Sequence, residues 1–151
     1  MNSNADTLRS KLEENSILRI AGAFDAMSAK LVELNEFDAV WAGSFAISAT
    51  HAVPDASIMT MTEFLQVAKN MVDSCNIPII ADCDTGFGGP SNVSHLVKQY
   101  DKVGVAGISI EDKIFQNKIV FLIMVSKIYS QKKNLLQKLS LEKNPKLIKI
   151  L

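Results

Sequence analysis

Short apolar runs alternate with amphipathic stretches along the first three quarters of the chain. The apolar runs have the length of strands buried in a parallel sheet, and they predict strands at residues 17–24, 38–45, 77–84 and 105–112. Between them, apolar residues recur at helical spacing and predict helices at residues 25–35, 60–73 and 91–103. This alternation of strand and helix predicts an α/β fold with a parallel sheet and right-handed crossovers.

Polar residues and a glycine mark the ends of these expected helices. Thr60 or Thr62 is placed to cap the second helix, and Ser91 is placed to cap the third. Gly104 follows the third helix, where glycine commonly ends a helix in the left-handed conformation. A polar loop is expected at residues 48–60, between the second strand and the second helix.

Two of the expected strands end in acidic residues. Asp82 and Asp84 close the third strand, and Glu111 and Asp112 close the fourth. Acids beside a core are costly unless a cation or hydrogen bonds compensate, and Mg²⁺ prefers carboxylate oxygens. Asp82 and Asp84 are two residues apart and are expected to point the same way, while small neighbours favour Glu111 over Asp112 as the third member. The sequence therefore predicts a metal site at this rim; a turn or helix cap after the strand is the alternative.

Other polar groups near these strand ends carry weaker signals. The glycines at positions 86, 88 and 89 fit either close approach to an anion or a simple turn. Lys113 is placed either as a counter-ion for a substrate phosphate or as a surface lysine. Asp55 lies in the expected long loop, where a functional carboxylate and a Pro-Asp turn are both reasonable interpretations. His95 is expected on a helix, at the surface or packed, and not as a ligand.

The formal net charge of zero conceals two regions of opposite sign. Residues 1–115 contain 15 Asp and Glu against 8 Lys and Arg, a balance of −7, whereas residues 116–151 contain one acid against 8 Lys, a balance of +7. The second region has no Gly, Ala, Asp or Thr, and its propensities predict a helix at residues 125–142. We therefore divide the chain into residues 1–115, built of strand–helix units, and an atypical Lys-, Leu- and Ile-rich tail at residues 116–151.

Composition indicates a cytoplasmic protein without a nucleic-acid or membrane partner. The first 14 residues contain no apolar signal segment, and the longest strongly apolar run, residues 119–125, is far shorter than the roughly 20 residues of a membrane span. A net charge of zero gives no reason to expect a nucleic-acid or membrane partner. Cys75 and Cys83 lack metal or redox spacing and are expected to be reduced core residues.

Five segments occur in an order and spacing that belong together: residues 22–30 (GAFDAMSAK), 40–49 (VWAGSFAISA), 53–57 (VPDAS), 81–88 (ADCDTGFG) and 110–115 (IEDKIF). With these segments the chain resembles the phosphoenolpyruvate mutase/isocitrate lyase superfamily, from about residue 17 to residue 115. The resemblance implies a (β/α)8 TIM barrel, of which the chain supplies about the first four strand–helix units. It also implies Mg²⁺ as the cofactor, phosphonopyruvate or phosphoenolpyruvate as the substrate, and intact relatives that form homo-oligomers.

The resemblance assigns a role to each acid of the rim. Asp82 matches the position of the direct metal ligand, and Asp84 and Glu111 match positions that support the metal through water. Asp55 matches the carboxylate that receives or guides the migrating phosphoryl group. Such a group needs positioning and spread charge more than a strong base, which agrees with a rim of acids around a cation.

Substrate binding is also implied by the resemblance. Gly43, Ser44 and Phe45 match the loop whose backbone holds the substrate carboxylate and oxygens. Carbon–carbon lyases of the superfamily carry a Lys-Arg-Cys-Gly-His segment after the fourth strand, and this chain has none. It has Glu-Asp-Lys at residues 111–113 and Phe115, as mutases and phosphonopyruvate hydrolases do. We therefore expect a phosphoenolpyruvate mutase-like isomerase, with phosphonopyruvate hydrolase as the alternative.

The resemblance and the composition both change at Gln116. Asn117 stands where the family carries a lysine, and Ile119 stands where a residue separates mutases from hydrolases. We take as a hypothesis that the reading frame shifts near Gln116, leaving a truncated barrel with little or no activity. A non-enzymatic fragment that associates with an intact relative is then a third possibility.

Overall fold

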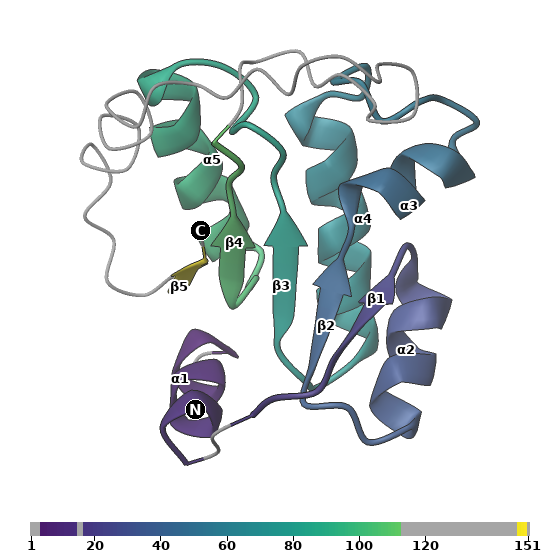
Figure 1. Ribbon diagram of the computed structural model, residues 1–151, viewed down its shortest axis with the longest axis vertical. Helices are drawn as coiled ribbons and strands as arrows, with labels where there is room; N and C mark the ends of the chain where they lie inside the picture. Colours follow the sequence, from purple (N-terminus) through teal and green to yellow (C-terminus); the bar gives the residue numbers. More distant parts are fainter. Residues whose placement is uncertain (1–3, 15–16, 113–147, 151) are drawn as a thin grey trace.

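The computed structural model describes residues 4–14, 17–112 and 148–150 (Figure 1). In chain order the elements are α1 (Asn4–Glu14), β1 (Ile20–Ala23), α2 (Ala26–Leu34), β2 (Ala39–Ala42), α3 (Ser44–Thr50), α4 (Met61–Ser74), β3 (Ile79–Asp82), α5 (Pro90–Lys102), β4 (Gly107–Ser109) and β5 (Ile148–Ile150). The strands form one parallel sheet in the order β1-β2-β3-β4-β5. The predicted α/β fold with a parallel sheet is confirmed.

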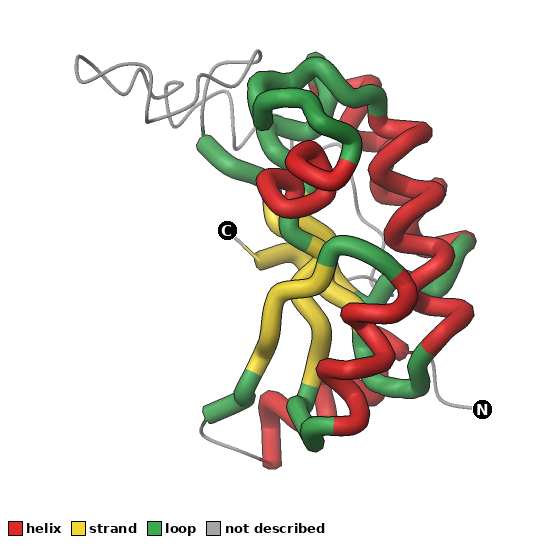
Figure 2. The backbone as a smooth tube through the Cα atoms, turned by 90° about the vertical axis from the view of Figure 1, so that its right-hand side faces the viewer, coloured by secondary structure: helices red, strands yellow, loops and turns green. Residues whose placement is uncertain are grey.

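Helices α2, α4 and α5 lie along one face of the sheet (Figure 2). Each connects two neighbouring parallel strands, so β1 to β4 build three successive strand–helix–strand units. The arrows of β2, β3 and β4 point to the same edge of the sheet, at the top of Figure 1. Loops that follow these strands are therefore brought together at one edge, which is where the acidic residues were expected.

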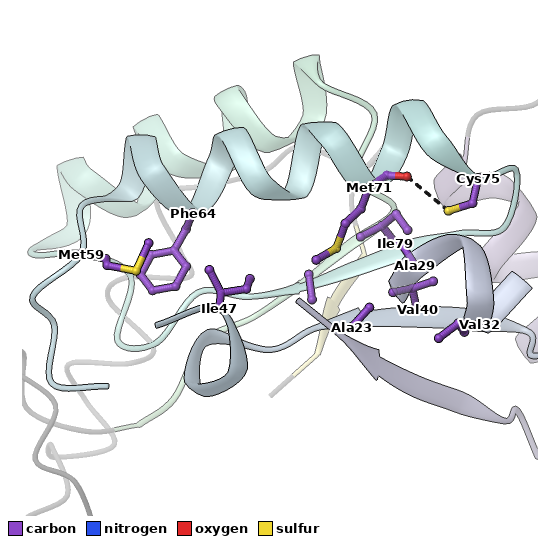
Figure 3. Close-up of a cluster of buried hydrophobic side chains, with 11 residues drawn as sticks. Ala23, Ala29, Val32, Val40, Ile47, Met59, Phe64, Met71, Cys75 and Ile79 are labelled. Atoms are coloured by element: carbon purple, nitrogen blue, oxygen red, sulfur yellow. Dashed lines mark hydrogen bonds between the residues drawn. The ribbon is translucent and has the colours of Figure 1, made fainter. Parts of the chain in front are cut away.

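The core between the sheet and its helices follows from the apolar spacing of each helix. On α4, Phe64 and Met71 turn inward and pack with Ile79 and Val40 of the strands (Figure 3). The buried thiol of Cys75 donates to the Met71 carbonyl oxygen at 3.2 Å and closes that end of the cluster. Helix α5 buries the four positions at helical spacing, Val93, Leu96, Val97 and Tyr100, which is the face that the sequence predicted. Cys75 and Cys83 are both buried and reduced, as expected.

Helix α1 covers the amino-terminal end of the strands, a feature that the sequence did not predict. Its Leu8 is only 1% exposed and packs with Ala39, Ile80 and Ala106. The Asn4 side chain donates to the Gly104 carbonyl oxygen at 2.8 Å, so the helix is also fixed by a polar contact. The helix buries only Ala5 and Leu8. Residues 4–14 accordingly contain few apolar side chains and show a weak amphipathic pattern.

The expected helix ends are confirmed in two cases and wrong in one. Thr60 caps α4: its hydroxyl accepts from the Glu63 backbone N–H at 3.4 Å, and the Glu63 carboxylate accepts from the Thr60 backbone N–H at 2.6 Å. Gly104 follows α5 with φ of 87°, as expected of a glycine at this position. The expected cap at Ser91 is wrong, because α5 begins one residue earlier at Pro90, where the missing N–H costs nothing.

The second expected strand and the loop after it are partly wrong. Strand β2 ends at Ala42, and α3 occupies Ser44–Thr50, where the sequence predicted the end of a strand and the start of a polar loop. The small residues of this segment fit either structure, so local pattern did not separate them. Only residues 51–60 form the connection to α4.

Parts of the tail prediction lie outside the described residues. The helix expected at residues 125–142 lies there, and the division between residues 1–115 and 116–151 stays a prediction. Strand β5, which pairs with β4 through Gly107 and Ile148, was not predicted. In the part of the chain that the structure describes, no helix combines the length and apolar character needed to cross a membrane.

The turn after β3 gives the first testable prediction. Gly86 has φ of 85°, and a Cβ placed on it would lie 2.5 Å from Cγ2 of the buried Val93. We expect Gly86→Ala to lower the free energy of unfolding by about 1–3 kcal/mol, from backbone strain and crowding together. Urea unfolding measures this, with Gly22→Ala as the matched control, since a Cβ there meets no atom within 4 Å. Equal free energies of unfolding for Gly86→Ala and Gly22→Ala would contradict the strain and crowding expected at Gly86.

Candidate active site at the carboxyl ends of the strands

The register of the sheet brings the predicted site residues to one place. Ala42 of β2 is level with Ala81 of β3, and Asp82 is level with Ser109 of β4. The residues that directly follow these positions therefore lie side by side, and we call residues 43–45, 82–85 and 109–111 the carboxyl rim. The acidic pair after β3, the acid after β4 and the segment after β2 all belong to this rim, as the sequence predicted.

Asp82 is held by donors from two neighbouring segments. The Ser44 hydroxyl donates to Oδ2 of Asp82 at 2.8 Å, and the Ser44 backbone N–H donates to the same oxygen at 3.3 Å. The Asp84 backbone N–H donates to Oδ1 at 3.2 Å. Burial raises the pKa of Asp82, while these three hydrogen bonds oppose the rise by stabilising the carboxylate. The carboxylate is therefore fixed in orientation at the end of β3.

Asp84 is the most buried acid of the carboxyl rim, with 3% of its surface exposed. Strand β3 ends at Asp82 and Asp84 has φ of 44°, so the strand alternation expected to align the two acids is wrong. They come together because the chain turns. The Asp84 carbonyl oxygen accepts from the Glu111 backbone N–H at 2.6 Å, and the Cys83 N–H donates to the Ser109 carbonyl oxygen at 2.9 Å. These bonds fasten the turn after β3 to the end of β4.

Four carboxylates influence one another here. Burial raises the pKa of Asp84 to about 7, and the negative charges of Asp55, Asp82 and Glu111 add to that rise. Asp55 and Glu111 are each half-buried, and one carboxylate oxygen of each is enclosed. The structure thus brings together Asp55, Asp82, Asp84 and Glu111, which three different connections supply. A cluster of this kind is electrostatically unfavourable without a cation.

The three residues expected to bind substrate differ in their conformation and exposure. Gly43 precedes α3 in an extended conformation, and Ser44 is buried at the first position of that helix. Phe45 follows on α3 and is 66% exposed. Lys113 lies outside the described residues. The glycine-rich stretch forms a turn, in which the Gly86 N–H donates to the Cys83 carbonyl oxygen at 2.8 Å.

A pocket beside the carboxyl rim was not found from the sequence. It has a volume of about 330 Å³ and lies between the segment before α4 and the start of α5. Met59, Met61 and Phe87 give it apolar walls, and Asn92 and His95 add polar groups. Apart from Phe87, these residues lie outside the quoted segments, and they adjoin because the ends of two crossover connections meet. His95 is exposed on its helix, which agrees with the expectation for that residue.

Comparison with known proteins places this arrangement in a family. The family described as phosphoenolpyruvate phosphomutase matches residues 8–138. The chain belongs to the phosphoenolpyruvate phosphomutase family. A solved structure of a phosphoenolpyruvate phosphomutase from Streptomyces platensis subsp. rosaceus superimposes with a TM-score of 0.89 and 35% identity, over 96% of this chain and 52% of that one. The predicted superfamily and the fold class of its barrels are therefore confirmed.

Two further relatives show the range of the superfamily. The isocitrate lyase of Haloferax volcanii is 39% identical over 74% of this chain and 33% of its own length. A structure of phosphonopyruvate hydrolase in complex with oxalate and Mg²⁺ superimposes with a TM-score of 0.83 and 31% identity, covering 92% of this chain and 47% of that one. The chain thus spans about a third to a half of the length of these relatives. Membership of the family indicates an enzyme, but lyases and hydrolases resemble the chain as closely as mutases.

The donor set of the carboxyl rim suits the Mg²⁺ seen in a member of the superfamily. Its side chains offer carboxylate and hydroxyl oxygens, which hard cations prefer to nitrogen or sulfur. Among the described residues, no three His, Cys, Asp or Glu side chains converge closely enough to bind a metal ion together. Mg²⁺ commonly keeps several waters and takes only one or two protein carboxylates, so this spacing fits Mg²⁺ better than a closed protein cage.

The raised pKa of Asp84 gives a pH-dependent prediction for the metal-free protein. In the unfolded chain Asp84 ionises near its ordinary pKa of 3.8, whereas in the folded protein it ionises near 7. The contribution of Asp84 to the stability of the folded state is therefore greatest below the lower value, and it is lost as the pH rises between the two values. We expect Asp84→Asn to be more stable than the unchanged protein in EDTA, by a margin that grows by about 2 kcal/mol between pH 5 and pH 8.

Urea unfolding at several pH values measures this margin. Asp73→Asn serves as the control, because Asp73 is an exposed acid on α4 and pairs with Lys69. A margin for Asp84→Asn that stays constant with pH, or that shrinks above pH 6, would show that the Asp84 carboxylate is not crowded by its neighbours.

Proposed function

We propose that this chain carries the metal-binding half of an Mg²⁺-dependent, phosphoenolpyruvate mutase-like enzyme that interconverts phosphoenolpyruvate and phosphonopyruvate. The observation that carries the proposal is the electrostatic influence that Asp55, Asp82, Asp84 and Glu111 exert on one another at and beside the carboxyl rim. Four acids in one partly buried place require compensating positive charge, and a divalent cation supplies part of it. The Mg²⁺ and oxalate present in the related hydrolase structure support the same choice of cation.

Asp82 is the residue best suited to bind the metal directly. Its carboxylate is held in one orientation by Ser44 and by the Asp84 backbone. Asp84 and Glu111 would hold metal-bound water, since they adjoin Asp82 without forming a direct ligand set with it. When bound, Mg²⁺ supplies positive charge to the phosphoryl and enolate oxygens of the substrate. Asp82, Asp84 and Glu111 would keep that charge at the carboxyl rim.

The remaining residues would position the substrate. The backbone N–H of Phe45, in the first turn of α3, would hold the substrate carboxylate, whereas the Gly43 N–H already donates to the Ala23 carbonyl oxygen at 3.4 Å. Asp55 reaches the cluster from the connection after α3 and would guide the phosphoryl group as it moves between carbon and oxygen. Lys113, which directly follows the described part of β4's connection, would balance the phosphate charge. Transfer of a metaphosphate-like group depends mainly on such positioning and on exclusion of water.

Phosphonopyruvate hydrolase is the second candidate, because a hydrolase structure superimposes on this chain nearly as well as the mutase structure. The two reactions share a substrate and a metal site and differ in whether water receives the phosphoryl group. A third candidate is a fragment that acts by associating with an intact relative. Strand β1 supports it, since β1 lies at the edge of the sheet and exposes Ile20, with Phe24 exposed just beyond.

Mg²⁺ binding tests the metal site in this chain directly. We expect calorimetric titration with MgCl₂ to show one binding event that disappears in Asp82→Asn, because the amide cannot supply the anionic oxygen. Asp73→Asn, an exposed acid on α4, should bind as the unchanged protein does. Absence of Mg²⁺ uptake by the unchanged protein, or equal uptake by Asp82→Asn, would refute the proposed site.

Phosphorus NMR with phosphonopyruvate and Mg²⁺ separates the candidate reactions. Formation of phosphoenolpyruvate supports the mutase, and release of phosphate without phosphoenolpyruvate supports the hydrolase. We expect turnover by residues 1–151 alone to be slow, since the β1 edge of the described sheet has no neighbouring strand. If neither product forms, size-exclusion chromatography with a full-length relative tests the third candidate, which requires a shared peak.

A further inference from the structure

Ser44 occupies an unusual place for a residue expected to bind substrate. Its side chain is 3% exposed, and its hydroxyl donates to Oδ2 of Asp82 at 2.8 Å. The Asp84 backbone N–H donates to Oδ1 of the same carboxylate at 3.2 Å. Ser44 comes from the connection after β2, whereas both acids come from the connection after β3. One hydroxyl therefore links two strands at the point where the carboxylates converge.

The hydrogen bonds to Asp82 divide its acceptor positions unevenly. An ionised carboxylate offers about four lone-pair positions, two on each oxygen. Ser44 occupies both positions on Oδ2 with its hydroxyl and its backbone N–H, and the Asp84 N–H occupies one on Oδ1. By this count, one lone-pair position on Oδ1 of Asp82 is left for a cation. A cation that binds Asp82 would then meet a single oxygen in a fixed orientation.

We propose that Ser44 is a positioning residue for the metal ligand and not primarily a substrate contact. Its hydroxyl holds Oδ2 of Asp82, so that Oδ1 alone is presented to the cation. The inference rests on the proposed Mg²⁺ site. Hydrogen-bonding partners of metal ligands typically contribute 10- to 100-fold to metal affinity, because they fix the orientation of the ligand before the metal arrives.

A pair of matched variants isolates the hydroxyl. Ser44→Thr keeps the hydroxyl, and Ser44→Val has the same shape without it, so crowding at this buried site affects both alike. We expect the Mg²⁺ dissociation constant of Ser44→Val to exceed that of Ser44→Thr at least tenfold, in calorimetry without substrate. We expect Ser44→Ala to bind Mg²⁺ as weakly as Ser44→Val does. Ser48→Ala is the control, because Ser48 is equally buried one turn later on α3.

The outcomes separate this inference from the proposed function. If the unchanged protein takes up no Mg²⁺, the metal site itself fails. If it binds Mg²⁺ and the Val and Thr variants bind equally well, the metal site stands and the role of Ser44 is overturned. A loss in Ser48→Ala as large as that in Ser44→Ala would also overturn it, since the effect would then come from packing of α3. A substrate-contact role predicts unchanged Mg²⁺ affinity and a raised KM.

Discussion

The crowding of carboxylates at the carboxyl rim is the constraint on which the rest of the structure depends. Parallel strands must end together at one edge, and here the ends of β3 and β4 and the connection after β2 and α3 each deliver an acid to that edge. Each acid alone would be tolerated at the surface. Burial raises the pKa of Asp84 to about 7 and the neighbouring acids add to that rise, so part of the folding free energy is spent on holding them.

The packed core beneath the carboxyl rim holds the acids in place despite their cost in folding free energy. Cys83 lies between Asp82 and Asp84 in sequence, yet it is fully buried and turns towards α5, where it packs with Tyr100 and Val93. Cys83 fixes this segment to the core, and the turn at Asp84, where φ is 44°, directs that acid towards the carboxyl rim. The hydrogen bonds to Ser109 and Glu111 then fasten the same segment to β4. Packing and site geometry are therefore produced by adjacent residues of one turn.

The sequence predicted the parts of this arrangement that depend on periodic burial. The strands, the inward face of α5 and the meeting of acids at one edge all follow from apolar spacing and from the parallel connection of strands. Three features escaped because they depend on single contacts. Helix α1 is held by Leu8 and Asn4, α3 begins in a segment of small residues that suits a strand equally well, and Asp84 is aligned by a turn with positive φ.

The same distinction explains why the chemistry is harder to assign than the fold. Residues 43–45, 82–85 and 109–111 gather carboxylate and hydroxyl oxygens at one edge, as the proposed cation site requires, and lyases, hydrolases and mutases of the superfamily all resemble this half of the fold. What separates the reactions is the fate of the substrate once its oxygens are neutralised, which depends on the groups that enclose it. The resemblance to all three classes therefore follows from the shared fold of this half, and it does not select one reaction.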